Sequence, residues 1–149
     1  MSAIMKEIHE AINVGQQLQQ SLAEANNSLK SASNWGIADL LGGGLIISAI
    51  KHSRMQEARN EIYRSQELLA RFKSELGDVH MLNKDIELDV SGFLSFADFF
   101  FDGLLADWMV QSRIQSCKER INQLQGDVEN AMQTLYRMER QQQEESKGP

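Results

Sequence analysis

Residues 55–90 read MQEARNEIYRSQELLARFKSELGDVHMLNKDIELDV. Apolar side chains recur in this stretch at alternating steps of three and four, and charged or amide side chains fill most positions between them. Because this is the heptad spacing of a helix that lies along partner helices, the stretch predicts a coiled-coil helix. The repeating positions are Met55, Ala58, Ile62, Ser65, Leu69, Phe72, Leu76, Val79, Asn83, Ile86 and Val90.

The apolar pattern keeps its phase across Gly77 and Asp78, where the residue types alone would suggest a break. A turn at this point would reset the phase, whereas a glycine inside a helix costs only about 1 kcal/mol relative to alanine. We therefore expect one helix from Leu45 to Val90, roughly 70 Å long at about 1.5 Å per residue. Ser65 and Asn83 are polar exceptions that could fix the register of its pairing.

Two further stripes with the same spacing predict one helix before this stretch and one after it. The first, within residues 2–32, consists of Ile4, Ile8, Ala11, Gly15, Leu18, Leu22, Ala25, Leu29 and Ala32. The last consists of Ile114, Cys117, Ile121, Leu124, Val128, Ala131, Leu135 and Met138.

Together the three stripes predict an all-α fold, an elongated antiparallel three-helix coiled-coil bundle with residues 45–90 as its long central helix. The first helix is expected to pack antiparallel on residues 45–75, and the last helix antiparallel on the whole central helix. Residues 1–140 would form this single helical domain. The polar residues 141–149 would form a disordered tail.

Turn-forming residues separate the predicted helices. Asn34 and Gly36 are usual helix-stop residues, and three consecutive glycines follow them. Asp39 and Asp98 suit the first turn of a following helix, where carboxylates are favoured. The residues assigned to the turns are Trp35, Gly36, Asp39, Gly42, Gly43, Gly44, Asp98 and Gly103.

Residues 38–62 align with residues 97–121 as an internal repeat. Ala38-Asp39 matches Ala97-Asp98, and Ser53-Arg54 matches Ser112-Arg113. Chance agreement between amphipathic helices explains apolar matches better than these polar ones. The alignment therefore indicates a duplicated helix-turn-helix unit.

The same segments resemble a family of uncharacterised, mainly Gram-positive bacterial helical proteins. The motifs are W-G-x-x-D-x-x-G-G-G-L, from Trp35 to Leu45, and F-A-D-x-F-F-D-G-L, from Phe96 to Leu104. The resemblance covers roughly residues 33–115. It implies a bacterial cytosolic protein and brings no known activity or catalytic residue.

An aromatic segment lies between the second and third predicted helices. If the first turn is centred near residues 38–39, Ile4 faces about residue 73 of the central helix. The N-terminal end of the first helix then lies opposite about Leu76, and the first helix covers nothing beyond that point. Residues 76–91 and 96–111 would then form a two-helix arm without a third helix over its apolar side chains. Such surfaces usually mark interfaces, so we expect a symmetric homodimer or an unknown protein partner. The interface residues would be Phe96, Phe99, Phe100, Phe101, Leu104, Leu105, Trp108 and Met109.

Charge and composition limit the class of protein. The chain has 15 Lys and Arg against 21 Asp and Glu, a net charge of −6, which argues against non-specific nucleic-acid binding. Met1 to Glu10 reads as a charged amphipathic helix rather than a signal peptide, so a cytoplasmic protein is expected. The single cysteine, Cys117, excludes an internal disulfide and is expected in the core.

These features favour a non-enzymatic interaction or assembly protein without a cofactor. One alternative is a metal- or ligand-binding helical protein that uses Asp39 with His52, or Asp98 with Asp102 and Asp107. The three histidines lack the helical spacing of a metal pair. A second alternative is peripheral membrane binding by the aromatic segment, although its polar residues are acidic and anionic lipid would repel them. The sequence names no pathway, partner or ligand.

Overall fold

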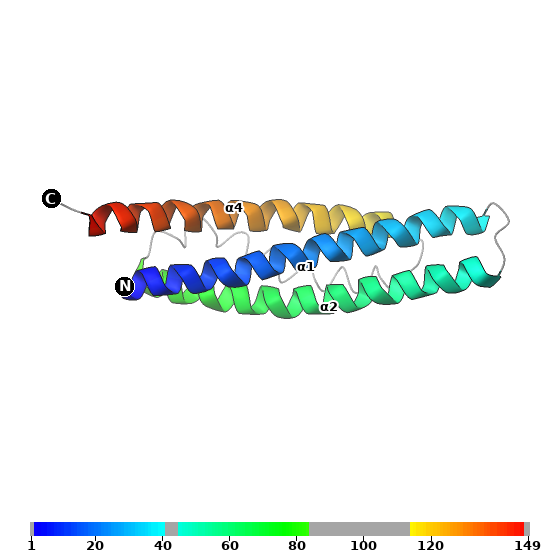
Figure 1. The fold of residues 1–149 in the computed structure, drawn as a ribbon, viewed down its shortest axis with the longest axis horizontal. Coiled ribbons are helices and arrows are strands. Elements are labelled where there is room, and N and C mark those ends of the chain that lie inside the picture. The colour runs from blue at the N-terminus through cyan, green and yellow to red at the C-terminus, as the bar shows by residue number, and fades with distance from the viewer. Residues whose placement is uncertain (1, 41–44, 84–113, 148–149) are drawn as a thin grey trace.

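The computed structural model describes residues 2–40, 45–83 and 114–147, which contain three α-helices and no strand. Helix α1 spans Ala3–Leu40, α2 spans Leu45–Leu82, and α4 spans Ile114–Ser146. The three helices lie side by side in an elongated helical bundle (Figure 1). The predicted all-α class is confirmed for the described residues.

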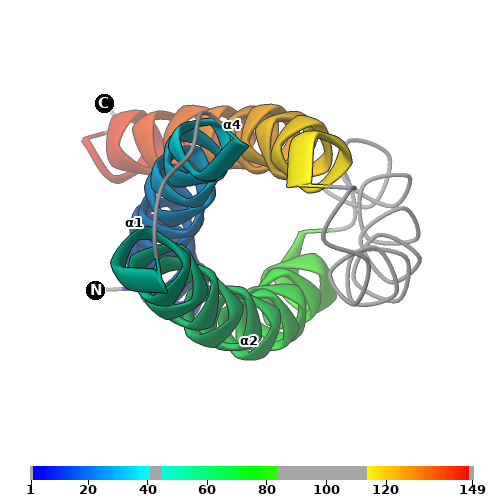
Figure 2. The same cartoon turned by 90° about the vertical axis from the view of Figure 1, so that its right-hand side faces the viewer.

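Helix α1 lies between the other two. Among these three helices, close backbone approach joins α1 to α2 and α1 to α4 only, and Figure 2 shows α2 and α4 on different sides of α1. Both run antiparallel to α1, and they are therefore parallel to each other (Figure 1). The prediction that α4 packs antiparallel on a central helix at 45–90 is wrong, because α1 occupies the central position.

The predicted stripes form the core. Phe72, Leu76 and Val79 of α2 are fully buried together with Ile8 and Leu18 of α1. On α4 the stripe is buried from Cys117 to Met138, so the expected core position of this cysteine is confirmed. Periodicity alone therefore located the buried face of each helix.

Helix α1 also buries residues that its predicted stripe omits, namely Ile12, Val14 and Ser21. A helix with one partner needs one apolar stripe, whereas a helix between two partners buries residues on both flanks of that stripe. Ser21 faces α2, where it bonds Ser65, while Gln19 on the opposite flank bonds Glu129 of α4. These flanking residues are the sequence signal of the central helix.

The helix ends differ from the predicted ones at three places. Helix α1 starts at an N-cap, where the Met5 amide donates to Ser2 Oγ at 3.2 Å. It then continues to Leu40, so the predicted end at residues 33–36 is wrong. Asn and Gly are only weakly unfavourable inside a helix, and the flanking residues 30–33 and 37–41 contain good helix formers. Trp35, Gly36 and Asp39 thus lie in α1 rather than in a turn.

Helix α2 passes through Gly77 as predicted but ends at Leu82 instead of Val90. The Asn83 amide donates the last bond to the Val79 carbonyl at 2.8 Å, so this asparagine closes the helix rather than continuing the stripe. Helix α4 continues to Ser146, into the predicted disordered tail, because residues 141–146 are Gln, Glu and Ser without a proline or glycine.

The pairing register of α1 and α2 also differs from the predicted one. Ser21 contacts Ser65 at 2.8 Å, which sets Ile4 opposite the last turn of α2 instead of residue 73. The expectation that the N-terminal end of α1 lies opposite Leu76 is therefore wrong. Helix α1 covers α2 beyond that point, and Leu76 and Val79 are buried. The error follows from the predicted turn near residues 38–39, because α1 continues to Leu40.

At Gly15 a side chain of α2 and a side chain of α4 meet against the backbone of α1. A Cβ atom at this position would overlap Met132 Sδ of α4 and lie 2.9 Å from Phe72 Cε1 of α2. Both side chains are fully buried. The absence of a side chain at Gly15 therefore lets α2 and α4 pack against the same turn of α1.

We expect Gly15→Val to destabilise the bundle by about 2–3 kcal/mol, because overpacking a filled core forces side chains and helices apart. Urea unfolding followed by circular dichroism measures the change. Gly126→Ala is the matched control, since no other described residue lies within 4 Å of an added Cβ there. It should stabilise by roughly 0.5–1 kcal/mol through helix propensity. Equal effects of the two changes would contradict this role of Gly15.

Candidate functional site

The residues that the sequence singles out for interaction lie largely outside the described residues. This applies to the aromatic set from Phe96 to Met109, to Gly42–Gly44, and to Asp98, Asp102, Gly103 and Asp107. The structure places Asp39 in α1 and His52 in α2, and their side chains also lie outside the described part. The described residues instead bring together three polar groups and one exposed apolar pair.

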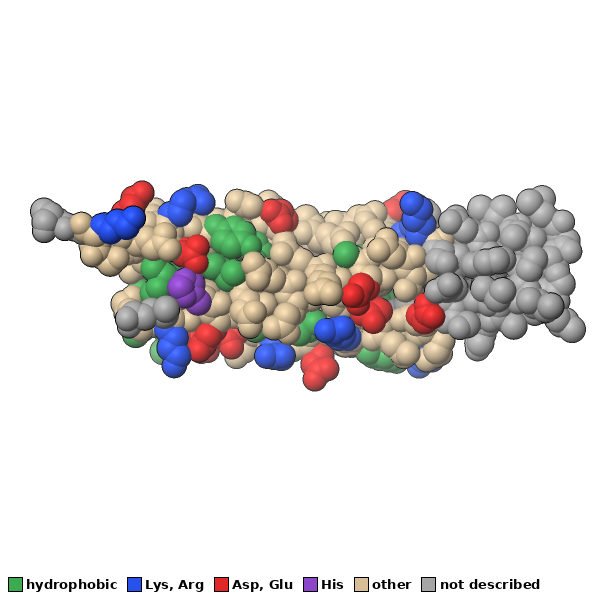
Figure 3. Space-filling model, in the orientation of Figure 1, with side chains coloured by type: hydrophobic (Ala, Val, Ile, Leu, Met, Phe, Trp, Pro, Cys, Tyr) green, Lys and Arg blue, Asp and Glu red, His purple; other side chains and the backbone are tan. Residues whose placement is uncertain are grey.

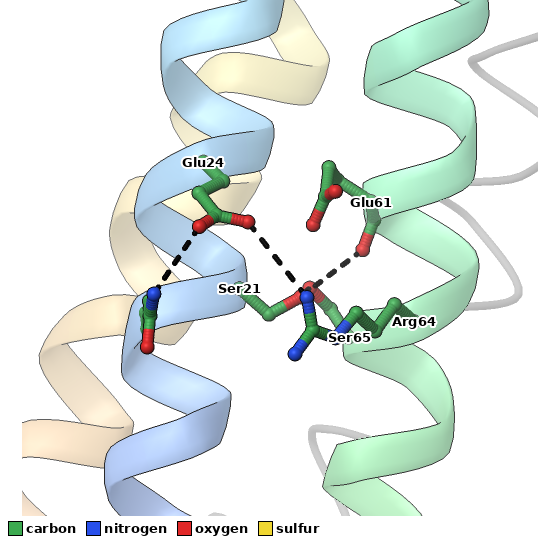
Figure 4. A network of polar contacts seen from close by, with 6 residues as sticks. Ser21, Glu24, Glu61, Arg64 and Ser65 are labelled. Atoms are coloured by element: carbon green, nitrogen blue, oxygen red, sulfur yellow. Dashed lines mark hydrogen bonds and ion pairs between the residues drawn. The ribbon is translucent and has the colours of Figure 1, made fainter.

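The first group is a buried hydroxyl pair between α1 and α2 (Figure 4). Ser21 Oγ lies 2.8 Å from Ser65 Oγ and also donates to the Glu61 carbonyl at 3.3 Å. Each serine is 1% exposed. Because both hydroxyls find partners across the interface, burying them costs little in this register.

Charged residues flank the hydroxyl pair. Arg64 Nη1 lies 3.9 Å from Glu24 Oε2, which ties the exposed edges of α2 and α1 together (Figure 4). Burial raises the pKa of Glu61, and the nearby Glu24 carboxyl raises it further, while Arg64 lowers it. Among the described residues, the buried Oε2 atom of Glu61 has no hydrogen-bond partner. This side of the interface therefore carries more negative charge than Arg64 neutralises.

The second group is a row of polar contacts between α1 and α4. Its contacts are His9 Nε2 to Glu139 Oε2 at 2.9 Å, Gln16 Nε2 to Tyr136 Oη at 3.4 Å, Gln19 Nε2 to Glu129 Oε2 at 2.7 Å, and Asn26 Nδ2 to Asn122 Oδ1 at 2.9 Å. They follow α1 along most of the shared length. Successive contacts move toward the end of α1 and toward the start of α4. The row therefore fixes the antiparallel direction of α4 relative to α1.

The third group is acidic and joins the start of α1 to the later turns of α2. Oxygens from the carboxylates of Glu7, Glu10 and Glu75 lie within 4.8 Å of one another. Burial raises the pKa of Glu75, and the charges of Glu10, Asp78 and Glu7 raise it further. Burial also raises the pKa of Glu7, followed by the charges of Glu10 and Asp78. We call Glu7, Glu10 and Glu75 the acidic cluster.

The acidic cluster can take up protons, and oxygen ligands of this type suit hard cations. Sequence reasoning missed it, because it depends on the register that sets the start of α1 opposite the end of α2. Within α1 alone, Glu7 and Glu10 are ordinary helix-surface residues. Figure 3 shows acidic and basic side chains interspersed along the face that it presents.

An exposed apolar pair lies at the end of α2. Met81 is 74% exposed and Leu82 is 49% exposed. The other large exposed apolar side chain of the described residues, Tyr63, is 44% exposed. Arg59 stacks on it, with its Cζ atom 5.5 Å from the ring centroid. Met81 and Leu82 thus form the more exposed apolar surface, and they fall inside the predicted arm.

Comparison of the chain with protein-family models, with curated proteins and with solved structures finds no match. None of the described helices combines the length and the apolar character needed to cross a membrane.

The acidic cluster predicts a specific pH dependence. Because the pKa of Glu75 is raised in the folded state, the folded state binds protons more tightly than the unfolded chain. The stability that this group contributes should therefore grow as the pH falls from neutrality through the raised pKa, and decline as the pH rises through it.

Glu75→Gln removes this charge and should raise the melting temperature at pH 7 by about 1–3 °C. It should also flatten the dependence of the melting temperature on pH between neutrality and the ordinary glutamate range. Glu144→Gln, which changes an exposed carboxylate of α4 outside the cluster, is the control. A steeper pH dependence in Glu75→Gln would contradict the repulsive character of the cluster.

Proposed function

We propose that this chain is a non-enzymatic interaction or assembly protein, and that it self-associates through the segment that follows α2. The observation that carries the proposal is the exposure of Met81 and Leu82 at the end of a helix whose apolar stripe is buried from Ile62 to Val79. Fully burying a side chain of this size contributes about 1.5–3 kcal/mol. An exposed apolar pair that is followed in the sequence by an aromatic-rich segment therefore favours a contact with another protein surface.

The finer architecture belongs to the same proposal. The steps of three and four in all three buried stripes support coiled-coil packing along the bundle. The polar matches between residues 38–62 and 97–121 support an internal duplication of a helix-turn-helix unit. The two glycine- and aromatic-rich motifs support kinship with the uncharacterised bacterial helical family, and with it a cytoplasmic location.

The partner in this proposal is a second copy of the chain. A homodimer needs no further gene product and brings two identical apolar surfaces together around a two-fold axis. The observed register of α1 and α2 makes the proposed interface smaller than the arm predicted from the sequence, because Leu76 and Val79 are buried within the chain. The proposed interface is therefore Met81 and Leu82 together with the large apolar residues of the segment, which are Phe96, Phe99, Phe100, Phe101, Leu104, Leu105, Trp108 and Met109.

Sedimentation equilibrium at tens of micromolar tests the proposal, with a dimer expected. Phe100→Asp or Trp108→Asp should convert the dimer to a monomer, and Met81→Asp should weaken it at least tenfold, because a buried charge would replace apolar contact. Tyr63→Ser, which changes an exposed apolar residue elsewhere on α2, should leave it intact. A monomeric wild-type chain would overturn the homodimer. Stoichiometric bound metal that is lost in His52→Ala would overturn the non-enzymatic class.

A further inference from the structure

Heptad stripes leave one structural question open. A stripe repeats every seven residues, so sliding α2 along α1 by one heptad again sets apolar residues against apolar residues. The register predicted from the sequence pairs Ile4 with about residue 73, whereas the Ser21–Ser65 contact sets it opposite residue 82, about nine residues further along α2. Some feature beyond the stripes must therefore select the observed pairing.

The Ser21–Ser65 pair is one such feature. In the observed register the two hydroxyls meet at 2.8 Å. A one-heptad slide in one direction would set Ser21 against Ala58 and Ser65 against Val14. A slide in the other direction would set Ser21 against Phe72. In either case Ser21 would lose its Ser65 partner within the apolar stripe, and an unsatisfied buried hydroxyl is unfavourable.

The contact between Phe72 and Gly15 is a second, independent feature. The ring of Phe72 fills the space that a side chain at Gly15 would occupy. A slide of one heptad would set this ring against Ile8 or Leu22 instead, and both are fully buried side chains. The helices would have to separate to admit the ring there, because interiors are packed without spare volume.

The charges near the start of α1 act against the observed register. It brings the carboxylates of Glu7, Glu10 and Glu75 within 4.8 Å of one another, and like charges at such distances repel. A one-heptad slide in either direction would move Glu75 away from Glu10. The slide that sets Ser65 against Val14 would also leave Val79 beyond the start of α1. Electrostatics therefore does not select the observed register.

We infer that the Ser21–Ser65 hydroxyl pair and the Phe72–Gly15 contact form a register lock that excludes the heptad-shifted pairings of α1 and α2. The lock keeps Leu76 and Val79 buried against α1 and limits the exposed apolar surface at the end of α2 to Met81 and Leu82. This inference concerns the chain itself and does not depend on the proposed homodimer.

Spin labels on α1 and α2 test the lock directly. Asn27→Cys and Ser74→Cys introduce labels at exposed positions in a Cys117→Ala background. Labelled chains are diluted with unlabelled chains, so that distances within one chain dominate. Double electron–electron resonance should give one distance for the otherwise unaltered chain. In the release variant, which adds Ser21→Ala, Ser65→Ala and Phe72→Leu, a second population should appear, displaced by about 10 Å because seven residues rise about 1.5 Å each.

Leu29→Ala is the matched control, because it weakens the core without changing either part of the lock and should keep one distance. A single unchanged distance in the folded release variant would overturn the inference, as would the same second distance in the control.

A double-mutant cycle tests the hydroxyl pair even if the release variant does not fold. Ser21→Ala and Ser65→Ala should each lower the folding equilibrium constant about fivefold, the expected loss for one hydrogen bond. The double variant should lose clearly less than the product of the two, because each single variant already removes the whole Ser21–Ser65 bond. Independent effects that simply multiply would overturn the role of the pair.

Discussion

Three helices of this protein meet where one residue has no side chain. Phe72 of α2 and Met132 of α4 both reach the space beside Gly15 of α1, and both are fully buried there. This contact requires α1 to lie between the other two helices. It determines how closely α2 and α4 approach α1 and where along α1 each of them packs. The remaining interactions extend outward from it, since Ser21 continues the α1–α2 interface and Gln19 the α1–α4 interface. A side chain at position 15 would force at least one neighbour to move.

The two interfaces of α1 are held in different ways. Toward α2 the specific contact is a buried hydroxyl pair in the apolar stripe, flanked by an ion pair at the edge. Toward α4 polar contacts repeat along the helix beside the buried stripe, from His9 to Asn26. Hydrogen bonds at an exposed edge contribute less to stability than buried ones, but they define direction and alignment. The chain thus combines an apolar core of low specificity with a few polar contacts of high specificity.

Sequence periodicity located the buried face of each helix, because burial depends mainly on the apolar spacing of that helix. Leu69 and Leu124, for example, were assigned to the core correctly. The passage of α2 through Gly77 could also be predicted. The central helix could not be identified in this way, since its signal lay in Ile12, Val14 and Ser21, which the single stripe of α1 omitted. Ser21 and Ser65 together carried the register, but only Ser65 was recognised as a polar exception.

The site was less predictable than the fold for the same physical reason. The acidic cluster joins Glu7 and Glu10 to Glu75, and its formation depends on a register that differs from the predicted one by about nine residues. The aromatic residues from Phe96 to Met109 and the glycines at 42–44 fall outside the described residues, so their proposed roles remain predictions. The exposure of Met81 and Leu82 could not be predicted, because it follows from the end of α2 at Leu82. The apolar pattern of the sequence continues to Val90 and gives no sign of that end.

The central claim is that Gly15, Phe72 and Met132 meet at one point of α1. Nuclear Overhauser effects in a sample with labelled methionine methyl groups and phenylalanine rings measure this most directly. Phe72→Leu and Met132→Leu assign the two signals. The account predicts cross-peaks from the Met132 methyl group to the Gly15 α-protons and to the Phe72 ring. Cross-peaks from Met132 to the Phe72 ring without any to Gly15 would contradict it, because α4 would then pack on α2 rather than on α1.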